Sequence, residues 1–192
     1  MKLLHIDSSI LGQNSASREL SADIVARWQD AKPGLQYLHR DLDTNPLPHL
    51  DGAALAKSDP IATAESERVM GEFLAADVIV IGAPMYNFSV PSTLKAWIDR
   101  IAVAGRTFRY TDKGPQGLAG GKKVIIASTR GGIHSGTASD FVEPYLRQVF
   151  GFLGITDIEF VTAEGLAYSP EHRAEGMAKA RAAIPLVLAE AA

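Results

Sequence analysis

Cysteine is missing from this chain of 192 residues. Without it the protein can hold neither a disulfide framework nor a thiol nucleophile, and it lacks the thiolate ligands of many zinc and iron–sulfur sites. The composition fits a reducing compartment. Any redox chemistry would therefore depend on a borrowed cofactor rather than on protein thiols.

Long hydrophobic runs and a large charge of one sign are also missing. The most apolar run, residues 78–81, is far shorter than the about 20 residues that cross a bilayer. The apolar stretch near the N-terminus is broken by His5 and stopped by Asp7, so we expect no targeting segment. A net charge of −3 is too small for a nucleic-acid footprint. We expect a cytoplasmic protein with no membrane or nucleic-acid partner.

The remaining composition is that of an ordinary globular protein, with 46% hydrophobic and 21% charged residues. A chain of this length can bury about 70% of the surface that its unfolded form exposes, which is enough for a full core. Because the chain is short for two domains, we predict that residues 1–192 form one domain.

Short aliphatic runs predict β-strands, and the stretches between them predict helices. Successive apolar residues, typical of parallel strands buried on both faces, occur at residues 2–7, 35–41, 77–82, 123–129 and 158–163. Helical spacing predicts helices in the first two connections, a third from Pro91 or Ser92, and two more over residues 141–153 and 170–191. This alternation predicts an α/β fold with a doubly wound parallel sheet.

Two connections are too long to be plain links, residues 44–59 and 105–121. Both are rich in Pro, Gly and Asp. We expect both to lie on the surface, the second as a small hairpin through residues 108–110.

Ligands of open α/β sheets bind beyond the carboxyl ends of the strands, so we expect a ligand site in the loops there. Residues 8–18, after the first strand, are rich in Ser and lead into a helix, whose free N–H groups favour a phosphate. The alternative is a Ser that only caps the helix. No G-x-G-x-x-G and no Walker lysine occur in the sequence. A monophosphate is therefore favoured over a nucleoside triphosphate or a dinucleotide.

The loops after the third and fourth strands also have the composition of a binding site. Met85, Tyr86 and Phe88 suit a flat heteroaromatic ring, although such a loop can also pack its aromatic groups onto the neighbouring helix. Gly131, Gly132 and Gly136 allow close backbone approach or positive φ, as a surface turn would also require. Arg130 offers a charge for an anionic ring edge. Three successive strand ends with such loops favour a ligand.

These segments are similar to those of a known family, the FMN-dependent NADH azoreductases and quinone reductases of flavodoxin-like fold. The likeness spans nearly the whole chain, and the segments that carry it best are Ser9 with Ser15-Ala16-Ser17, Ala83-Pro84-Met85-Tyr86-Asn87-Phe88 and Thr129-Arg130-Gly131-Gly132-Ile133-His134. The resemblance implies a five-stranded sheet of order 2-1-3-4-5 with helices on both faces. It also implies bound FMN and an enzyme that uses NADH to reduce quinones to hydroquinones and to cleave aromatic azo compounds to amines.

The resemblance further implies roles for individual residues. The FMN phosphate is expected at Ser9, Ser15, Ala16 and Ser17, with Ala16 contributing only its backbone. The isoalloxazine ring is expected at Met85, Tyr86, Asn87, Phe88, Thr129, Arg130, Gly131 and Gly132. The family is homodimeric, and the second chain closes the substrate cleft. NADH and the electron acceptor would use one site in turn, in a ping-pong cycle, and no side chain need act as an acid or base.

Other readings of the sequence are weaker. A serine hydrolase would need a G-x-S-x-G elbow, which is missing. His5, His39, His49, His134 and His172 show no metal-ligand spacing, so we expect no metal site. His134 either contacts the substrate or flavin edge or is a solvated loop residue. A flavodoxin-like electron carrier would share the fold and FMN but commonly shows stronger charge asymmetry than −3.

Overall fold

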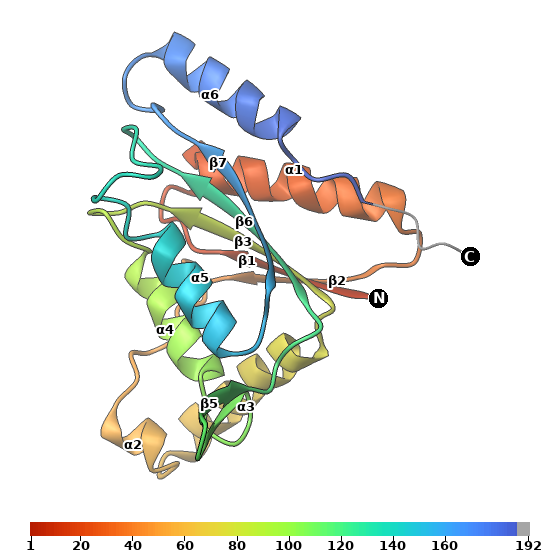
Figure 1. Ribbon diagram of the computed structural model, residues 1–192, viewed down its shortest axis with the longest axis vertical. Coiled ribbons are helices and arrows are strands. Elements are labelled where there is room, and N and C mark those ends of the chain that lie inside the picture. The colour runs from red at the N-terminus through yellow and green to blue at the C-terminus, as the bar shows by residue number, and fades with distance from the viewer. Residues whose placement is uncertain (188–192) are drawn as a thin grey trace.

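The computed structural model of the protein describes residues 1–187 and is built on a five-stranded parallel sheet (Figure 1). The strands are β1 (Lys2–Asp7), β2 (Gln36–Asp41), β3 (Val78–Pro84), β6 (Lys123–Thr129) and β7 (Asp157–Ala163), in the spatial order β2-β1-β3-β6-β7. Counted along the chain, this is the predicted order 2-1-3-4-5. All neighbouring strands of this sheet are parallel, so every strand ends at the same edge.

Helices cover both faces of the sheet. Successive residues of each central strand point to opposite sides, and both sides are apolar, so both must be covered. In β3, Val78 and Val80 pack with α1 (Ala16–Ala31) and α6 (Pro170–Ala182). Ile79 and Ile81 face the other way, toward α3 (Pro60–Ala75), α4 (Ser92–Ile101) and α5 (Glu143–Phe152). The continuous apolar runs of the sequence therefore fill two separate cores.

Local sequence signals set the helix starts. The Ser15 side chain accepts the Arg18 N–H at the start of α1, and Asp59 accepts the Ile61 and Ala62 N–H groups at the start of α3. The start of α4 at Ser92 confirms the prediction.

The expectation of a helix over residues 170–191 is wrong at its end. Helix α6 ends at Ala182, since Pro185 disfavours helical backbone at the residue before it. Residues 188–191 of that prediction lie outside the described residues.

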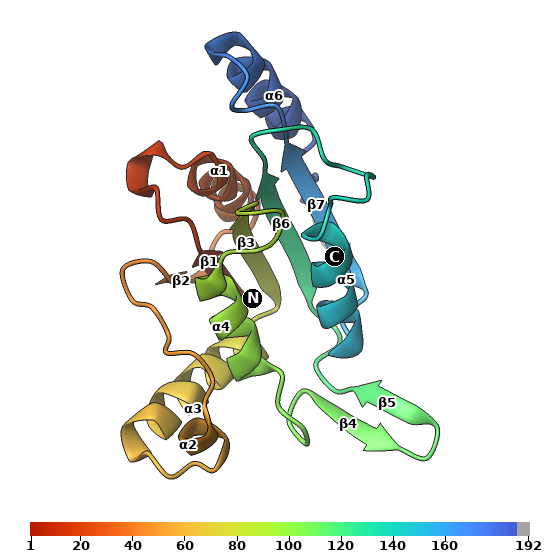
Figure 2. The same cartoon turned by 90° about the vertical axis from the view of Figure 1, so that its left-hand side faces the viewer.

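The two long connections have different structures. Residues 44–59 hold only the one-turn helix α2 (Gly52–Leu55), whereas β4 (Phe108–Thr111) and β5 (Gly114–Gly117) form the predicted antiparallel hairpin (Figure 2). The hairpin packs so closely on the turn after α5 that a Cβ on Gly117 would lie 2.1 Å from the Gly154 nitrogen. Only glycine fits there.

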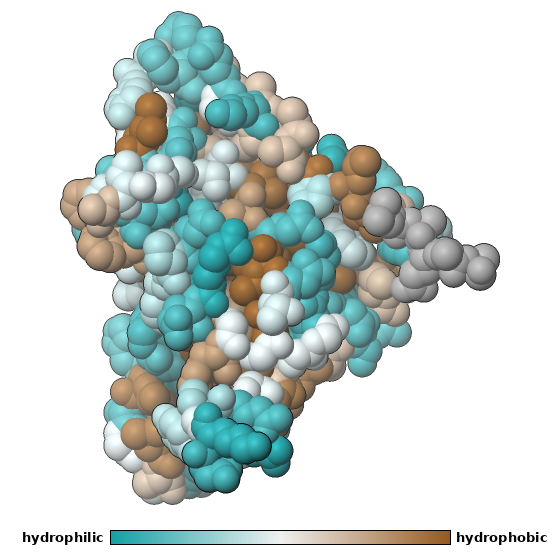
Figure 3. Space-filling model, viewed as in Figure 1, coloured by the Kyte–Doolittle hydropathy of each residue, from teal (hydrophilic) through white to brown (hydrophobic). Residues whose placement is uncertain are grey.

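Strand β7 forms a free edge of the sheet, in front of the other strands in Figure 1. Arg147 of α5 lies across this edge, with its Nη1 donating to the Ile158 carbonyl at 3.2 Å and its guanidinium 4.7 Å from the Phe160 ring centre. Lys123 pairs with Asp157 and Glu159 nearby. From this side the surface shows a small central hydrophobic area bordered by hydrophilic residues (Figure 3).

Within residues 1–187, no helix combines the length and the apolar character needed to cross a membrane.

Candidate cofactor site

Three loops meet beyond the carboxyl ends of β1, β3 and β6, on the side of the molecule that Figure 2 shows. They are residues 8–15, 85–91 and 130–142, and we call them the first, second and third loops. The Tyr86 hydroxyl lies 3.0 Å from Ser9 Oγ, which joins the first two loops. The Phe88 and His134 rings meet edge to face at 5.7 Å, which joins the second and third. The structure thus brings together the three segments that the sequence singled out.

The first loop ends in a group of hydroxyls and amides at the start of α1. Ser15 Oγ and Ser17 Oγ lie 3.1 Å apart, so one hydroxyl donates to the other and one hydroxyl hydrogen remains free. The N–H groups of Ala16 and Ser17 precede the first intrahelical bond and have no acceptor among residues 1–187. Three donors are therefore free at the positive end of a helix dipole, which favours an anion.

Ser9 connects the first loop to the second loop and to Arg18. It is fully buried and contacts Tyr86, while the Leu11 N–H donates to its Oγ at 3.3 Å. Its carbonyl accepts two bonds from Arg18, whose guanidinium also pairs with both carboxylate oxygens of Asp41 at 2.7 and 2.8 Å. Although burial raises the pKa of Asp41, the bonds from Arg18 and from backbone N–H groups lower it to about 2. This ion pair holds the first loop in place.

The second loop is a tight turn on β3. Tyr86 and Ser89 exchange both backbone hydrogen bonds, and the two residues between them adopt positive φ, 50° at Asn87 and 70° at Phe88. For a bulky aromatic residue this backbone conformation is strained. The Phe88 side chain is 52% exposed. The turn therefore holds an aromatic ring outward at the loop rim rather than packing it on the neighbouring helix.

The third loop is held through its carbonyl groups. The carbonyls of Arg130, Gly131 and Gly132 accept N–H groups from residues 165–167, whereas the N–H groups of both glycines have no acceptor in the described part of the chain. Of the three glycines for which positive φ was allowed, Gly136 adopts it, at 73°, and Gly131 and Gly132 do not. Glycine matters here for space, since a Cβ on Gly132 would lie 2.8 Å from His134 Nε2.

The expectation that Arg130 offers its charge to a ring edge is wrong. Its side chain is completely buried, and its guanidinium pairs with Asp140 at 3.0 Å and with Glu164 at 3.2 Å, which compensates for the loss of water. Glu164 Oε1 also accepts the N–H groups of His134 and Ser135 at 2.7 and 2.8 Å. Although burial raises the pKa of Glu164, these N–H groups and Arg130 lower it below its ordinary value. Arg130 positions the third loop rather than presenting a free charge.

The other predicted residues lie around the same edge. Met85 donates its N–H to the Thr129 carbonyl at 2.8 Å, which fixes the second loop to the end of β6. His134 is half-buried, and its Nδ1 lies 3.1 Å from Ser139 Oγ. Sequence reasoning missed the organising residues Arg18, Asp41, Asp140 and Glu164. Glu164 directly follows the fifth predicted strand, and this position at a strand end is the signal in the sequence that points to it.

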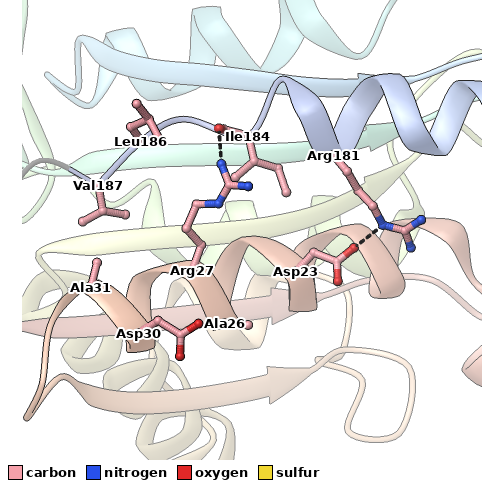
Figure 4. Close-up of a pocket in the computed structure, with 9 residues that line it drawn as sticks. All are labelled: Asp23, Ala26, Arg27, Asp30, Ala31, Arg181, Ile184, Leu186 and Val187. Atoms are coloured by element: carbon pink, nitrogen blue, oxygen red, sulfur yellow. Dashed lines mark hydrogen bonds and ion pairs between the residues drawn. The ribbon is translucent and has the colours of Figure 1, made fainter.

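Hollows in the surface occur both near these loops and away from them. A depression of about 510 Å³ at the start of α1 is lined by Asp7, Gly12, Gln13, Ser15, Arg18 and Glu19. A larger one, about 640 Å³, lies against the second half of α1 (Figure 4). Its arginines are already engaged, Arg27 with the Ile184 carbonyl and Arg181 with Asp23. Neither arginine of this larger depression is therefore free of a partner, in contrast to the N–H groups of the three loops.

A parallel sheet of order 2-1-3-4-5, with free donors at the start of the helix that follows its first strand, defines an α/β protein of the doubly wound class. The sequence profile of the flavodoxin-like fold family matches residues 1–186. The chain belongs to this family, which confirms the predicted fold class.

Individual relatives are more specific. The chain is 62% identical over 185 residues to the FMN-dependent NADH:quinone oxidoreductase of Stenotrophomonas maltophilia, covering 96% of this chain and 95% of that one. It is 64% identical over 184 residues to FMN-dependent NADH:quinone oxidoreductase 1 of Xanthomonas axonopodis pv. citri, with the same coverage. An azoreductase from Bacillus anthracis superposes with a TM-score of 0.85 at 27% identity, covering 96% of this chain and 98% of the other. The resemblance found from the sequence is confirmed.

Proposed function

We propose that this protein is an FMN-dependent oxidoreductase that uses NADH to reduce quinones to hydroquinones and to cleave aromatic azo compounds to amines. The observation that carries the proposal is the set of unpaired N–H groups at the start of α1 and in the second and third loops, together with one free hydroxyl hydrogen of the Ser15–Ser17 pair. All of them lie at one edge of the sheet. Relatives more than 60% identical are named FMN-dependent NADH:quinone oxidoreductases, and an azoreductase structure shares the fold.

The first loop fits the phosphate of FMN. The N–H groups of Ala16 and Ser17 and the free hydroxyl of the Ser15–Ser17 pair supply three donors for a dianion. The predicted contact of Ser9 would be indirect, because its Oγ is engaged with Tyr86 and Leu11. Arg18 lies behind the loop and holds the Ser9 carbonyl, so it shapes the cradle from behind.

The second and third loops fit a flat heteroaromatic ring. Phe88 supplies an exposed apolar face, and Met85 and Tyr86 lie half-buried beside it. The N–H groups of Asn87, Phe88, Gly131 and Gly132 have no acceptor within residues 1–187 and can donate to the polar edge of the ring. The position of Thr129 at the end of β6 suits a backbone contact with the same edge.

The protein's part in the reaction is to bind and to stabilise charge. FMN, when bound, supplies the two-electron hydride chemistry. Fixed N–H groups of the second and third loops oppose negative charge at the ring edge without having to reorganise, as the donors of an oxyanion hole do. No side chain of these loops is required as an acid or base, and His134 is placed to contact a substrate beside Phe88.

NADH and the electron acceptor would bind in turn at the same place. The sequence has no dinucleotide fingerprint for a second nucleotide site. Both partners must approach the reactive ring atom to within about 3.5 Å, so they cannot occupy the space together. This geometry supports a ping-pong cycle.

We also propose that the protein acts as a cytoplasmic homodimer of single-domain chains, with residues 1–192 as the FMN-binding domain. Large apolar side chains stay exposed around the three loops, among them Ile10 (61%), Phe88 (52%), Ile133 (64%) and Phe141 (57%). Exposed apolar groups that surround a site favour a partner surface. A second copy would cover them and close the substrate cleft.

Comparison of FMN with riboflavin, which lacks the phosphate, tests the assignment. Several charge-assisted hydrogen bonds at about 1.5–3 kcal/mol each should make FMN bind at least a hundredfold more tightly. Fluorescence titration of the apoprotein measures both affinities, and equal affinity would contradict the phosphate cradle. Turnover of excess NADH with a small quinone and no protein partner would separate the enzyme from an electron carrier.

A further inference from the structure

A cluster of two histidines and one aspartate lies on the α1 face of the sheet, where β1 pairs with the edge strand β2. His5 and His39 are register partners, and Asp7 lies two residues further along β1. His5 Nε2 is 3.4 Å from one carboxylate oxygen of Asp7, and His39 Nε2 is 3.0 Å from the other. The proposed function uses none of these side chains.

We propose that His5, Asp7 and His39 bind a divalent transition-metal ion of the Zn²⁺ class. Two imidazoles and one carboxylate are a common ligand set for zinc, with a fourth position left for water or a hydroxyl. The sequence analysis expected no metal site because the histidines lack ligand spacing along the chain. Parallel pairing of β1 with β2 brings two of them together.

The distances suit tetrahedral coordination. Zinc lies about 2.0–2.2 Å from nitrogen and oxygen ligands, which places ligand atoms about 3.3 Å apart. The two histidine–carboxylate distances of 3.4 and 3.0 Å, one to each oxygen of Asp7, are close to that value. One ligand atom from each of the three residues lies within 4.8 Å of the other two. The His39 side chain is 38% exposed, so it can rotate to bring its Nε2 closer to the other two ligand atoms. The same exposure leaves a path for the ion.

The surroundings of the three ligands support metal binding. The Tyr37 hydroxyl lies 3.0 Å from His5 Nδ1, so it can accept the Nδ1 proton while Nε2 faces the ion. Ser21 Oγ lies 2.9 Å from His5 Nε2 and donates to Asp7 at 3.0 Å, so it can orient these two ligands from the outer shell. The ligands stand on paired strands, which hold them more rigidly than loops would.

The local charge also favours a cation. Asp7, Asp41 and Asp43 surround the single guanidinium of Arg18. Arg18 approaches Asp7 only to 3.7 Å, whereas it lies 2.7 Å from Asp41. One guanidinium balances only one of the three carboxylates, so the local charge stays negative. A bound ion would join β1, β2 and, through Ser21, α1.

Calorimetric titration of the FMN-loaded protein with Zn²⁺ tests the proposal, after removal of metal by a chelator and exchange into buffer without phosphate. We expect one equivalent to bind. His39→Gln can keep a hydrogen bond to Asp7 but loses the imidazole ligand. Loss of an outer-shell partner lowers metal affinity by about 10–100-fold, so loss of a direct ligand should lower Zn²⁺ affinity by about a hundredfold or more. His49→Ala removes an exposed histidine elsewhere and should leave Zn²⁺ binding unchanged.

A spectroscopic readout separates ligation from a structural effect. Co²⁺ should give the ligand-field absorption of a tetrahedral site in the wild type and in His49→Ala, and none in His39→Gln. The thermal midpoint should rise with Zn²⁺ in the same two proteins only, because a ligand that binds the native state stabilises it. Substoichiometric binding, or equal Zn²⁺ affinity in wild type and His39→Gln, would overturn the proposal. Neither result would bear on FMN binding.

Discussion

Replacement of Glu164 by alanine should loosen the third loop and destabilise the protein. One carboxylate oxygen of Glu164 accepts from the His134 N–H, the Ser135 N–H and the Arg130 guanidinium, at 2.7, 2.8 and 3.2 Å. Breaking a buried ion pair from one side costs about 3–5 kcal/mol. Arg130 keeps Asp140 as a partner, and the Glu164 side chain is 20% exposed, so water replaces part of what is lost. We expect a loss of about 2–3 kcal/mol in the free energy of unfolding.

Urea denaturation of the FMN-free protein measures this loss, which should lower the midpoint by about 1 M. Glu67→Gln is the matched control. It removes a carboxylate from an ion pair with Arg106 that is exposed on both sides, and it should cost less than about 0.5 kcal/mol. FMN affinity should also fall in Glu164→Ala, because the amides of the third loop lose their anchor. A change within that of the control would refute the reasoning.

The pH dependence of this variant gives a second check. The pKa of folded Glu164 lies below its ordinary value of 4.5, so the unfolded chain takes up the proton first as the pH falls. The stabilisation from Glu164 is therefore fully present above pH 4.5 and is lost as the pH falls through the folded pKa. The difference in stability between wild type and Glu164→Ala should shrink over that range and stay constant above it.

Three further predictions concern the loops and the reaction. Asp41→Asn should cost about 2 kcal/mol at pH 7, since the Asp41 pKa is lowered to about 2, and in urea titrations this difference should vanish between pH 4 and pH 2. Gly132→Val should displace the His134 ring and lower FMN affinity and turnover more than stability. Gly131→Val should do the same more weakly, since a Cβ there meets Ala167 at 3.2 Å; unchanged FMN binding in both would remove this loop from the site. Initial rates with NADH and a quinone should give parallel double-reciprocal lines, and intersecting lines would contradict a shared site.

Local sequence signals predicted the strands, most helices, the β4–β5 hairpin and the three loops, because each depends on residues that are neighbours in the sequence. The strand order came from the family resemblance. Contacts between residues far apart in the sequence could not be predicted. Arg130 was predicted to offer its charge to a ligand, because its partners Asp140 and Glu164 lie elsewhere in the sequence. The pairing of His5 with His39 depends on strand register, which an apolar run does not encode. Ser9 illustrates both cases, since its loop was predicted and its contact with Tyr86 was not.

The Arg147 side chain across β7 has a consequence for handling the protein in solution. A free edge strand can recruit a strand from another molecule and start an aggregate. Here the Ile158 carbonyl already accepts from Arg147, and the guanidinium covers Phe160. An incoming strand would have to displace a charged group that is held in two ways. Arg147→Ala would uncover this edge, and concentrated samples of that variant should form aggregates sooner on storage than the wild type.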